Sequence, residues 1–259
     1  MTPIPSRFPM NIASDYANNM VKLIDIMHKA TMKKWNHGLE SQYKRAAGLV
    51  DAPADEIERM IEQLKNEYQI DDEHARRLAE DMLKKTRNFG IHQVDLQIAT
   101  IAGVNPNLRY PRMEARLKMA TQENVRLIKT IPEKYFGEVE RVVHEGVLSG
   151  TLTDDIADKI DIASNKTTNN AKLIARDQVG KFLATTTKAR QTQAGVKHYY
   201  WRTVGDNRVR ASHEDFEGNR YSWEEGSPEG HPGEPIQCRC IAEPDRDEVL
   251  NVFGQEENI

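Results

Sequence analysis

The stretch "VKHYYWRTVGDNRVRASHEDFEGNRYSW", which covers residues 196–223, decides the fold because the character of the chain changes there. Before it, apolar residues recur at steps of three and four, which is typical of amphipathic helices. Inside it, β-branched and aromatic residues surround a "GDN" turn, which is typical of strands. We therefore expect an α+β fold: a predominantly helical N-terminal region followed by helices packed on a small antiparallel β-sheet.

Four short strands are expected in the last quarter of the chain. A hairpin is predicted to join "VKHYYWRTV" to "RVR" through the "GDN" turn. Two more strands are predicted in "NRYSW" and "IQCRCIAE", and the loop "EEGSPEGHPGEP" between them has no period. We expect this sheet to pack against the helix that ends at Gly195.

Helices are predicted over most of the preceding chain. The first runs from Tyr16 into the mid-40s, with Ser14 as its cap. Two further amphipathic segments follow, the first with Pro53 in its first turn. The segment "GVNPNLRYPR", residues 103–112, then interrupts the pattern with glycine, asparagine and proline, and predicts a domain boundary.

Three more helices are expected between that boundary and Gly195. The first has Pro132 in its first turn and stops at Gly150. The second begins at Thr153, which is followed by two aspartates that suit the positive end of a helix dipole. The third presents one apolar face until the glycine ends it.

These signals divide the chain into four segments. Prolines at positions 3, 5 and 9 predict an extended arm over residues 1–12, which needs a neighbour to order it. A helical N-terminal domain is expected at 13–105 and a second domain, containing the sheet, at 110–246. Residues 247–259 are expected to form a C-terminal tail.

The composition restricts the class of protein. Of the 259 residues, 38% are hydrophobic and 29% are charged, which predicts a folded, polar, helix-rich protein. The net charge of -4 provides no general attraction to phosphate, so any contact with nucleic acid would need a local patch. We expect neither a signal peptide nor a membrane span, because no 18 apolar residues occur together.

Two arginines in the "RVR" segment are expected to share one face of a strand. Arg208 and Arg210 lie two positions apart, and side by side they need anionic partners. Asp206, Glu214 and Asp215 are the internal candidates. The alternative is that the arginines recognise an acidic surface or the DNA backbone.

Histidines and cysteines near the C-terminus raise the question of zinc. His213, His231, Cys238 and Cys240 supply two imidazoles and two thiols, a set that suits tetrahedral zinc. The spacing argues against it, because the thiols of C-x-C point to opposite faces in a regular strand. We expect both cysteines to be thiols in a reducing compartment and no cofactor, with zinc as the alternative if a bulge or turn occurs at Arg239.

Catalysis is the third possibility for the same residues. Asp206, His213 and Asp215 could hold a divalent metal for phosphodiester hydrolysis, and Cys238 with His213 could form a nucleophile and its base. No supporting motif accompanies either set: the sequence has no G-x-S-x-G, P-loop, G-x-G-x-x-G or H-E-x-x-H. We therefore predict no catalytic residue and no enzyme.

Several separate motifs together resemble one known family. In order they read "LIKTIPEKYFGEVERVVHEGVLSGTLTDDIADKI", "AKLIARDQVGKF", "YYWRTVGDNRVRASHEDFEGNRYSW" and "PGEPIQCRCIAEP". This order resembles the phage Mu F-like minor head proteins, also called phage head morphogenesis proteins, over the predicted domain at 110–246. The residues that carry the resemblance are Arg176, Trp201, Thr203, Asp206, Arg208, Val209, Arg210, His213, Gly218, Pro235, Cys238, Arg239 and Cys240.

The resemblance implies a structural protein of a tailed phage, made in the host cytoplasm and built into the virion head. Its implied partner is the portal protein, with coat or scaffold protein and packaged DNA as further candidates, and no membrane. The motif residues then rigidify a small module, and no reaction is implied. Toxin domains are fused to this module in some relatives, but the few residues after "CRC" are too short for one. The alternative is a metal-dependent nuclease or DNA-binding module carried in the phage head.

Overall fold

The computed structural model describes residues 6–39, 54–149 and 151–254. These residues form two compact units. The sheet unit comprises Met1–Ser14, Glu80–Thr121 and Ala175–Ile259, and the helical unit comprises Asp15–Ala79 and Gln122–Ile174. Each unit is discontinuous in sequence, which differs from the consecutive domains expected at 13–105 and 110–246, because long helices pass from one unit into the other.

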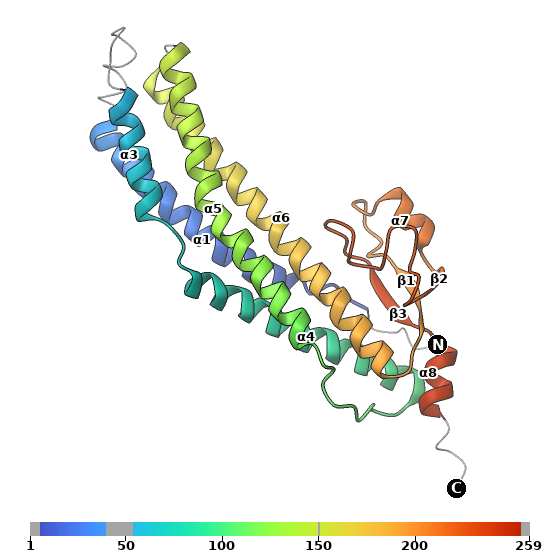
Figure 1. Ribbon diagram of the computed structural model, residues 1–259. Coiled ribbons are helices and arrows are strands. Elements are labelled where there is room, and N and C mark those ends of the chain that lie inside the picture. The colour runs from blue at the N-terminus through green and yellow to red at the C-terminus, as the bar shows by residue number, and fades with distance from the viewer. Residues whose placement is uncertain (1–5, 40–53, 150, 255–259) are drawn as a thin grey trace. The chain divides into compact units, whose positions relative to one another are not determined.

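Helices dominate the described chain, and a small sheet lies near its C-terminal end (Figure 1). This arrangement confirms the α+β fold. In order, the elements are α1 (Met10–Lys34), the π-helical turn η1 (Trp35–Leu39), α3 (Ala54–Glu67), α4 (Asp72–Ala102), α5 (Glu114–Ser149), α6 (Thr153–Gln193), β1 (His198–Arg202), α7 (Ala211–Phe216), β2 (Arg220–Ser222), β3 (Ile241–Pro244) and α8 (Arg246–Phe253). Among these described helices, none combines the length and apolar character needed to cross a membrane.

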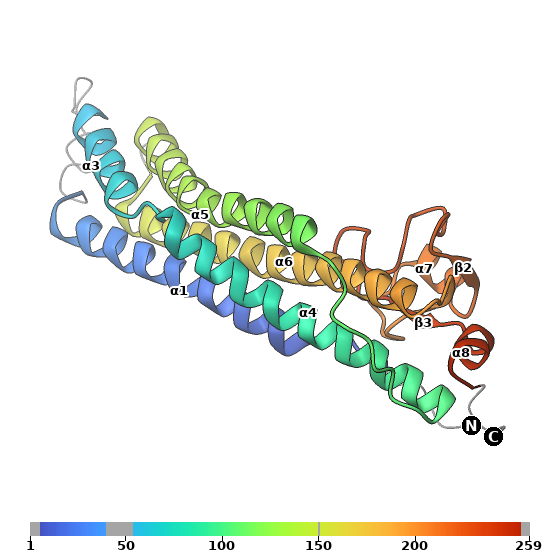
Figure 2. The ribbon, with the colours of Figure 1, turned by 60° about the horizontal axis from the view of Figure 1, so that its bottom comes forward.

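The helical unit is built from amphipathic helices, and α5 and α6 run side by side within it (Figure 2). Its core contains the apolar stripes expected from the sequence, including Met20 and Ile24 of α1 and Leu64 of α3, all fully buried. A buried hydrogen bond from the Tyr16 hydroxyl to Asn124 Oδ1, 2.9 Å long, joins α1 to α5. Apolar burial of this kind is the main source of stability for helices that pack together.

The N-terminal helix begins earlier than expected. Because α1 starts at Met10, the last three residues of the predicted 1–12 arm are helical, and the predicted end in the mid-40s lies outside the described residues. The described part of the arm does have a neighbour. The Arg7 amide donates to Gln93 Oε1 of α4 at 2.8 Å, and Phe8 is buried.

Two expected helix boundaries are wrong. Pro132 lies inside α5, which is one continuous helix, although the sequence placed it in a first turn. Likewise, α6 joins the two helices expected after residue 152 into one of 41 residues. The polar segment between them contains no glycine or proline, so packing of the flanking apolar turns can continue the helix through it.

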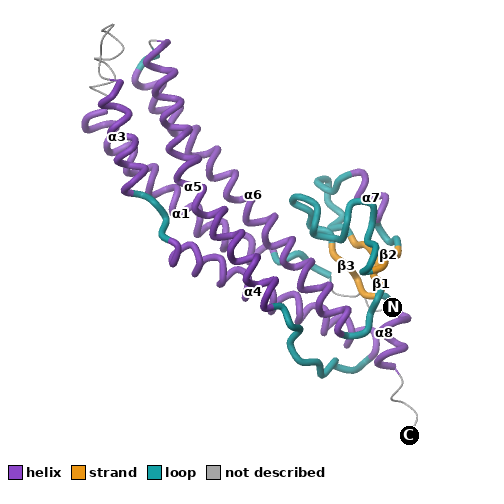
Figure 3. Tube along the Cα trace, in the orientation of Figure 1, coloured by secondary structure: helices purple, strands orange, loops and turns teal. Residues whose placement is uncertain are grey.

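The sheet has three antiparallel strands in the order β2-β1-β3 (Figure 3). Its central strand places Tyr199 opposite Tyr221 on one side and Trp201 opposite Ala242 on the other. Tyr199 and Trp201 are fully buried and form a core cluster with Trp223, Cys238, Cys240 and Ala242. The expected strand in "NRYSW" is confirmed by β2.

The expected hairpin to "RVR" is wrong, and the last strand is shorter than predicted. Residues 208–210 lie in a bend before α7, and the "IQCRC" segment is irregular, so that only Ile241–Pro244 forms β3. The Asp206 side chain accepts a hydrogen bond from the Arg208 amide, which stabilises the bend. Local turn chemistry therefore overrides the β-propensity of Val209.

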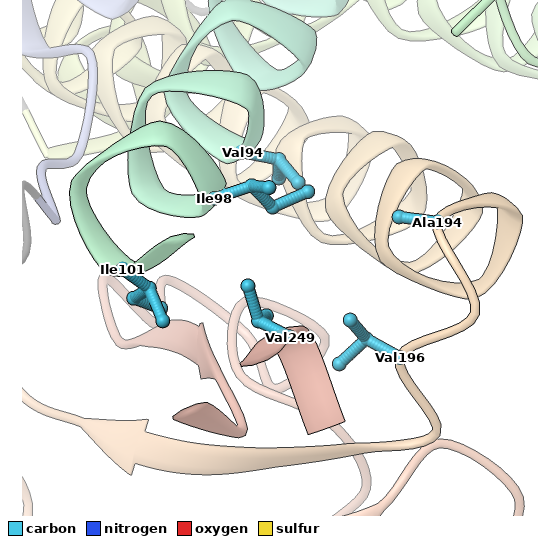
Figure 4. Packing of buried hydrophobic residues seen from close by; sticks show 6 residues of the cluster. All are labelled: Val94, Ile98, Ile101, Ala194, Val196 and Val249. Atoms are coloured by element: carbon cyan, nitrogen blue, oxygen red, sulfur yellow. The ribbon is translucent and has the colours of Figure 1, made fainter. Parts of the chain in front are cut away.

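A second core cluster lies where α4, the end of α6 and α8 meet (Figure 4). Val94 and Ile98 of α4 face Val249 of α8, which is fully buried. The expected tail at 247–259 is therefore wrong as far as residue 253, because this part is the helix α8. Asp245 caps α8 by accepting hydrogen bonds from the amides of Asp247 and Glu248.

Candidate functional site

One helix and one loop bring an imidazole and both thiols of the chain together. His213 Nδ1 lies 3.6 Å from Cys238 Sγ and 3.4 Å from Cys240 Sγ. All three side chains are buried, and their potential ligand atoms lie within 4.8 Å of one another. In the part of the chain that the structure describes, this is the one group of three or more His, Cys, Asp and Glu side chains gathered closely enough to hold a metal ion.

The two thiols converge because the C-x-C segment is irregular and directly follows a turn at residues 235–238. The Cys238 amide donates to the Pro235 carbonyl at 2.9 Å, and Gln237 adopts a positive φ of 57°. Asp177 of α6 holds this turn by accepting a hydrogen bond from the Gln237 amide at 2.9 Å. The alternation expected for a strand, which would have sent the thiols to opposite faces, therefore does not apply here.

His213 is fixed on both sides of its ring. Its Nε2 lies 3.2 Å from Glu229 Oε2, and its ring packs edge-on against Trp201 with centroids 5.2 Å apart. A hydrogen bond with Ser212 is the largest influence lowering the pKa of Glu229, and His213 adds to it, so this carboxyl is held ionised. In the tautomer whose Nε2 donates to this carboxylate, Nδ1 carries the lone pair that faces the thiols.

The two thiols differ in acidity. A hydrogen bond between them lowers the pKa of Cys238 to about 6 and raises the pKa of Cys240. The amides of Gly233 and Cys240 also donate to Cys238 Sγ, at 3.3 and 3.4 Å. Cys238 is thus the thiolate of the pair and Cys240 the thiol.

His231, the fourth residue of the expected zinc set, lies apart from this group. Its Nδ1 is 3.0 Å from the Tyr199 hydroxyl and its Nε2 is 2.9 Å from Lys188 Nζ. Burial and the nearby Lys188 lower the pKa of His231, so this ring is neutral. The structure therefore brings together three of the four predicted ligands.

The arginines of the motif are held by a carboxylate and by backbone. Arg239 donates two hydrogen bonds of 2.7 Å to Asp206, and Arg208 lies 3.4 Å from the same carboxylate. The Arg239 guanidinium lowers the pKa of Asp206, which stays ionised. Arg210 donates to the Ile236 carbonyl. Of the three expected partners, Asp206 is the one that pairs with Arg208.

The catalytic sets considered from the sequence are only partly assembled. Asp206, His213 and Asp215 do not form a group that could hold a metal ion among the described residues. Cys238 does contact His213, but that ring nitrogen is shared with Cys240. A thiolate whose imidazole is occupied by a second thiol is not arranged as a nucleophile with its own base.

Two further motif residues shape the surrounding loops. Trp201 is fully buried, and its indole Nε1 has no hydrogen-bond partner among the described residues. Gly218 follows α7 with a positive φ of 74°, and its amide donates to the Trp201 carbonyl. The tight turn into β2 requires this left-handed conformation, which favours glycine.

A cavity of about 170 Å³ opens beside the three clustered side chains. Basic side chains dominate its lining, so it is a cationic hollow with sulfur and imidazole in its wall. The lining residues are Arg176, Val204, Arg208, Val209, Arg210, His213, Gln237, Cys238, Arg239 and Cys240.

The sequence interpretation missed several residues that position this site. Glu229 orients His213, Asp177 holds the Gln237 turn, and Gln191 bonds both the Trp223 indole at 3.0 Å and the Ala242 carbonyl at 2.9 Å. Nothing in the sequence indicates these contacts. Glu229 lies in a loop without hydrophobic periodicity, and Asp177 lies beside an apolar helix face. Their partners lie far away in sequence.

Residues 137–243 match the family described as Phage Mu protein F like protein. An uncharacterised protein of Haemophilus influenzae (strain ATCC 51907 / DSM 11121 / KW20 / Rd) is 33% identical over 135 residues, which are 52% of this chain and 30% of that protein. The chain thus spans less than a third of the length of this relative. No solved structure matches.

The match contains every residue of the site and confirms the resemblance expected from the motifs. Over residues 137–243, the chain is similar to the Phage Mu F-like family.

Proposed function

We propose that this protein is a minor structural component of a tailed-phage head and acts in head morphogenesis. One observation carries the proposal: the region that matches the Mu F-like family contains charged side chains paired with one another, such as Arg239 with Asp206 and Arg202 with Glu243. Such a module presents a fixed surface to other head proteins. The family match supports a place among phage head proteins, and the virion is the location that we propose.

Internal ion pairs and hydrogen bonds support a structural role for the module. Arg202 of β1 bonds Glu243 of β3 at 2.9 Å, and Glu248 of α8 accepts from the amides of Lys197 and His198. Charged side chains that satisfy one another across strands and helices hold loops in place, which a three-stranded sheet with a small core does poorly alone.

The portal protein is the partner that we propose, with coat or scaffold protein as further contacts. Assembly takes place in the host cytoplasm in this proposal. Exposed apolar side chains, such as Leu148 of α5, Ile162 of α6 and Leu152 just before α6, offer contact area for other head proteins. The proposed activity is docking without chemical turnover.

Deletion of the gene in the phage that encodes it tests the proposal. Particles made without the protein should be misassembled or should eject their DNA poorly, and complementation by the wild-type gene should restore them. The protein should be found by mass spectrometry in purified heads, and tagged protein should retain the portal. Its absence from purified heads, together with normal heads after deletion, would contradict the proposal.

The cationic cavity supports one alternative, contact with the packaged DNA. Arg176, Arg208 and Arg210 line it, and phosphate contacts by arginine make affinity depend strongly on salt. DNA retention that falls steeply with salt, and less steeply for the double variant Arg208→Gln with Arg210→Gln, would favour this alternative. A nuclease instead predicts DNA cleavage with added Mg²⁺ or Mn²⁺, and we expect none.

A further inference from the structure

The proposed head function does not by itself explain why His213, Cys238 and Cys240 gather in the sheet unit, closely enough to hold a metal ion. All three residues are at most 5% exposed. Buried thiols and imidazoles need partners, and these three face one another. What occupies the space between them decides what the site is.

Hydrogen bonding alone does not account for the arrangement. Nδ1 of a neutral imidazole has one lone pair and accepts one hydrogen bond, but two sulfurs lie within 3.6 Å of it. The amides of Gly233 and Cys240 both donate to Cys238 Sγ, which favours a thiolate at that position. In this buried site, two sulfur atoms and the Nδ1 lone pair converge on one point. Such an arrangement of donor atoms is typical of a cation-binding site.

The distances fit zinc. With Zn–S bonds of about 2.3 Å, Zn–N bonds of about 2.0 Å and tetrahedral angles, sulfur and nitrogen ligands of one ion lie about 3.5 Å apart. The two observed distances between Nδ1 and sulfur are 3.6 and 3.4 Å. Thiolate and imidazole ligands favour zinc over magnesium or calcium, which take oxygen ligands.

The surroundings of the histidine also match a metal ligand. A metal-bound histidine donates its other ring N–H to a carboxylate or carbonyl, which fixes its tautomer and its orientation. Glu229 stands in this position, 3.2 Å from His213 Nε2, and points Nδ1 at the sulfurs. Glu229 is therefore a positioning residue and not a ligand.

From this geometry we propose that the sheet unit binds one zinc ion through His213 Nδ1, Cys238 Sγ and Cys240 Sγ. The fourth coordination position is filled by water from the arginine-lined cavity, whose wall contains all three ligands. The ion links α7 to the segment that precedes β3. It thus cross-links two segments that otherwise pack only on a small core. His231 takes no part.

The metal content of the purified full chain tests the proposal. The protein is expressed without a histidine tag, purified without chelator and analysed for zinc by mass spectrometry. We expect about one zinc per chain, and at least a tenfold lower content in Cys238→Ser and Cys240→Ser. The matched control is His231→Gln, a second buried histidine of the same unit, which should retain the metal.

Cobalt(II) added to the metal-free wild-type chain provides a measurement that does not depend on variants that fold. Four-coordinate cobalt bound by thiolate gives characteristic visible bands and a sulfur-to-cobalt charge-transfer band. We expect both, and we expect azide to shift them by displacing the bound water. Glu229→Gln should weaken zinc about tenfold in a competition with a chelator while leaving the ligands in place.

Three results would overturn the proposal. A zinc content near zero together with no cobalt spectrum would leave the cluster as hydrogen-bonded thiols. A loss of zinc in His231→Gln equal to that in Cys238→Ser would place the metal elsewhere. A cobalt spectrum that azide leaves unchanged would show a fourth ligand from the protein and refute the open position.

Discussion

The two units use charge in different ways. In the helical unit, Arg141 pairs with Glu138 and Glu145 on the surface, and its side chain is 49% exposed. In the sheet unit, Arg190 of α6 is 3% exposed and donates two hydrogen bonds of 2.7 Å to Asp95 of α4. In the helical unit, apolar stripes pack the helices and this ion-pair network stays exposed to water. In the sheet unit, the buried guanidinium joins α6 to α4 and also binds the Arg109 carbonyl in the irregular segment after α4, at 2.8 Å.

Replacement of the buried Arg190 should cause the largest loss of stability. Arg190→Met leaves the Asp95 carboxylate without its cation and removes one of the two donors to the Arg109 carbonyl, the other being Gln193 Nε2. We expect the free energy of unfolding, measured in urea, to fall by about 3–5 kcal/mol. Adding Asp95→Leu should recover part of the loss, because no unpaired charge then remains. A loss equal to that of the same change at Arg141 would remove the contrast between the units.

Two glycine substitutions, one in each unit, should change the free energy of unfolding in opposite directions. Gly218→Ala forces a left-handed conformation, with φ of 74°, on a residue with a Cβ atom and should cost about 1–2 kcal/mol. Gly137→Ala lies on an exposed face of α5 with no atom near its new Cβ, and should gain about 0.5–1 kcal/mol. Thermal unfolding of both variants measures this difference. A stabilising Gly218→Ala would show that the turn into β2 is not constrained.

The dependence of the unfolding free energy on acidic pH should reveal the contribution of the Asp206–Arg239 ion pair. The pKa of Asp206 is lowered by Arg239 from its ordinary value of 3.8, so the pair stabilises the folded state above that pH. This contribution is lost as the pH falls below about 4 toward the folded-state pKa. Asp206→Asn should therefore flatten the fall in unfolding free energy below pH 4. Asp158→Asn, at an exposed position of α6, is the control and should keep the wild-type slope.

The smallest effect is expected at the surface of the helical unit. Arg141→Gln removes the cation between Glu138 and Glu145, but both partners keep their contact with water. Exposed ion pairs contribute little, and salt screens them. The loss of stability should be barely measurable in dilute buffer and absent in 1 M salt. A loss that persists in high salt would indicate that this network is not a surface feature.

Much of the fold could be predicted from the sequence because it depends on local chemistry. Apolar periodicity located the helices, and the aromatic strand around Tyr199 and Trp201 located the centre of the sheet. Pro132 shows the limit of such signals, since packing on both sides of it continues α5 through a residue that usually begins or breaks a helix. The tail prediction failed for a similar reason: Val249 is buried only because α4 and α6 supply its partners.

The candidate site could be predicted as a set of residues but not as an arrangement. Residue type indicates His213 and the two cysteines as ligands, and the same criterion also indicates His231. The structure separates His231, which bonds Tyr199 and Lys188, and adds Glu229, which no motif indicated. Residue types show which ligands are available, but contacts between distant segments decide which of them meet.

By itself, the sequence determined the helices, the centre of the sheet and the resemblance to Mu F-like proteins, since these depend on periodicity, turn residues and ordered motifs along the chain. The tertiary structure alone decided that both thiols face one imidazole nitrogen. That outcome depends on a turn at Gln237, which Asp177, sixty residues earlier, holds by a hydrogen bond. In a strand the two cysteine side chains would point to opposite faces, but after this turn both point to His213. This change in the direction of the side chains depends on long-range hydrogen bonds, which the local propensity of the residues does not encode.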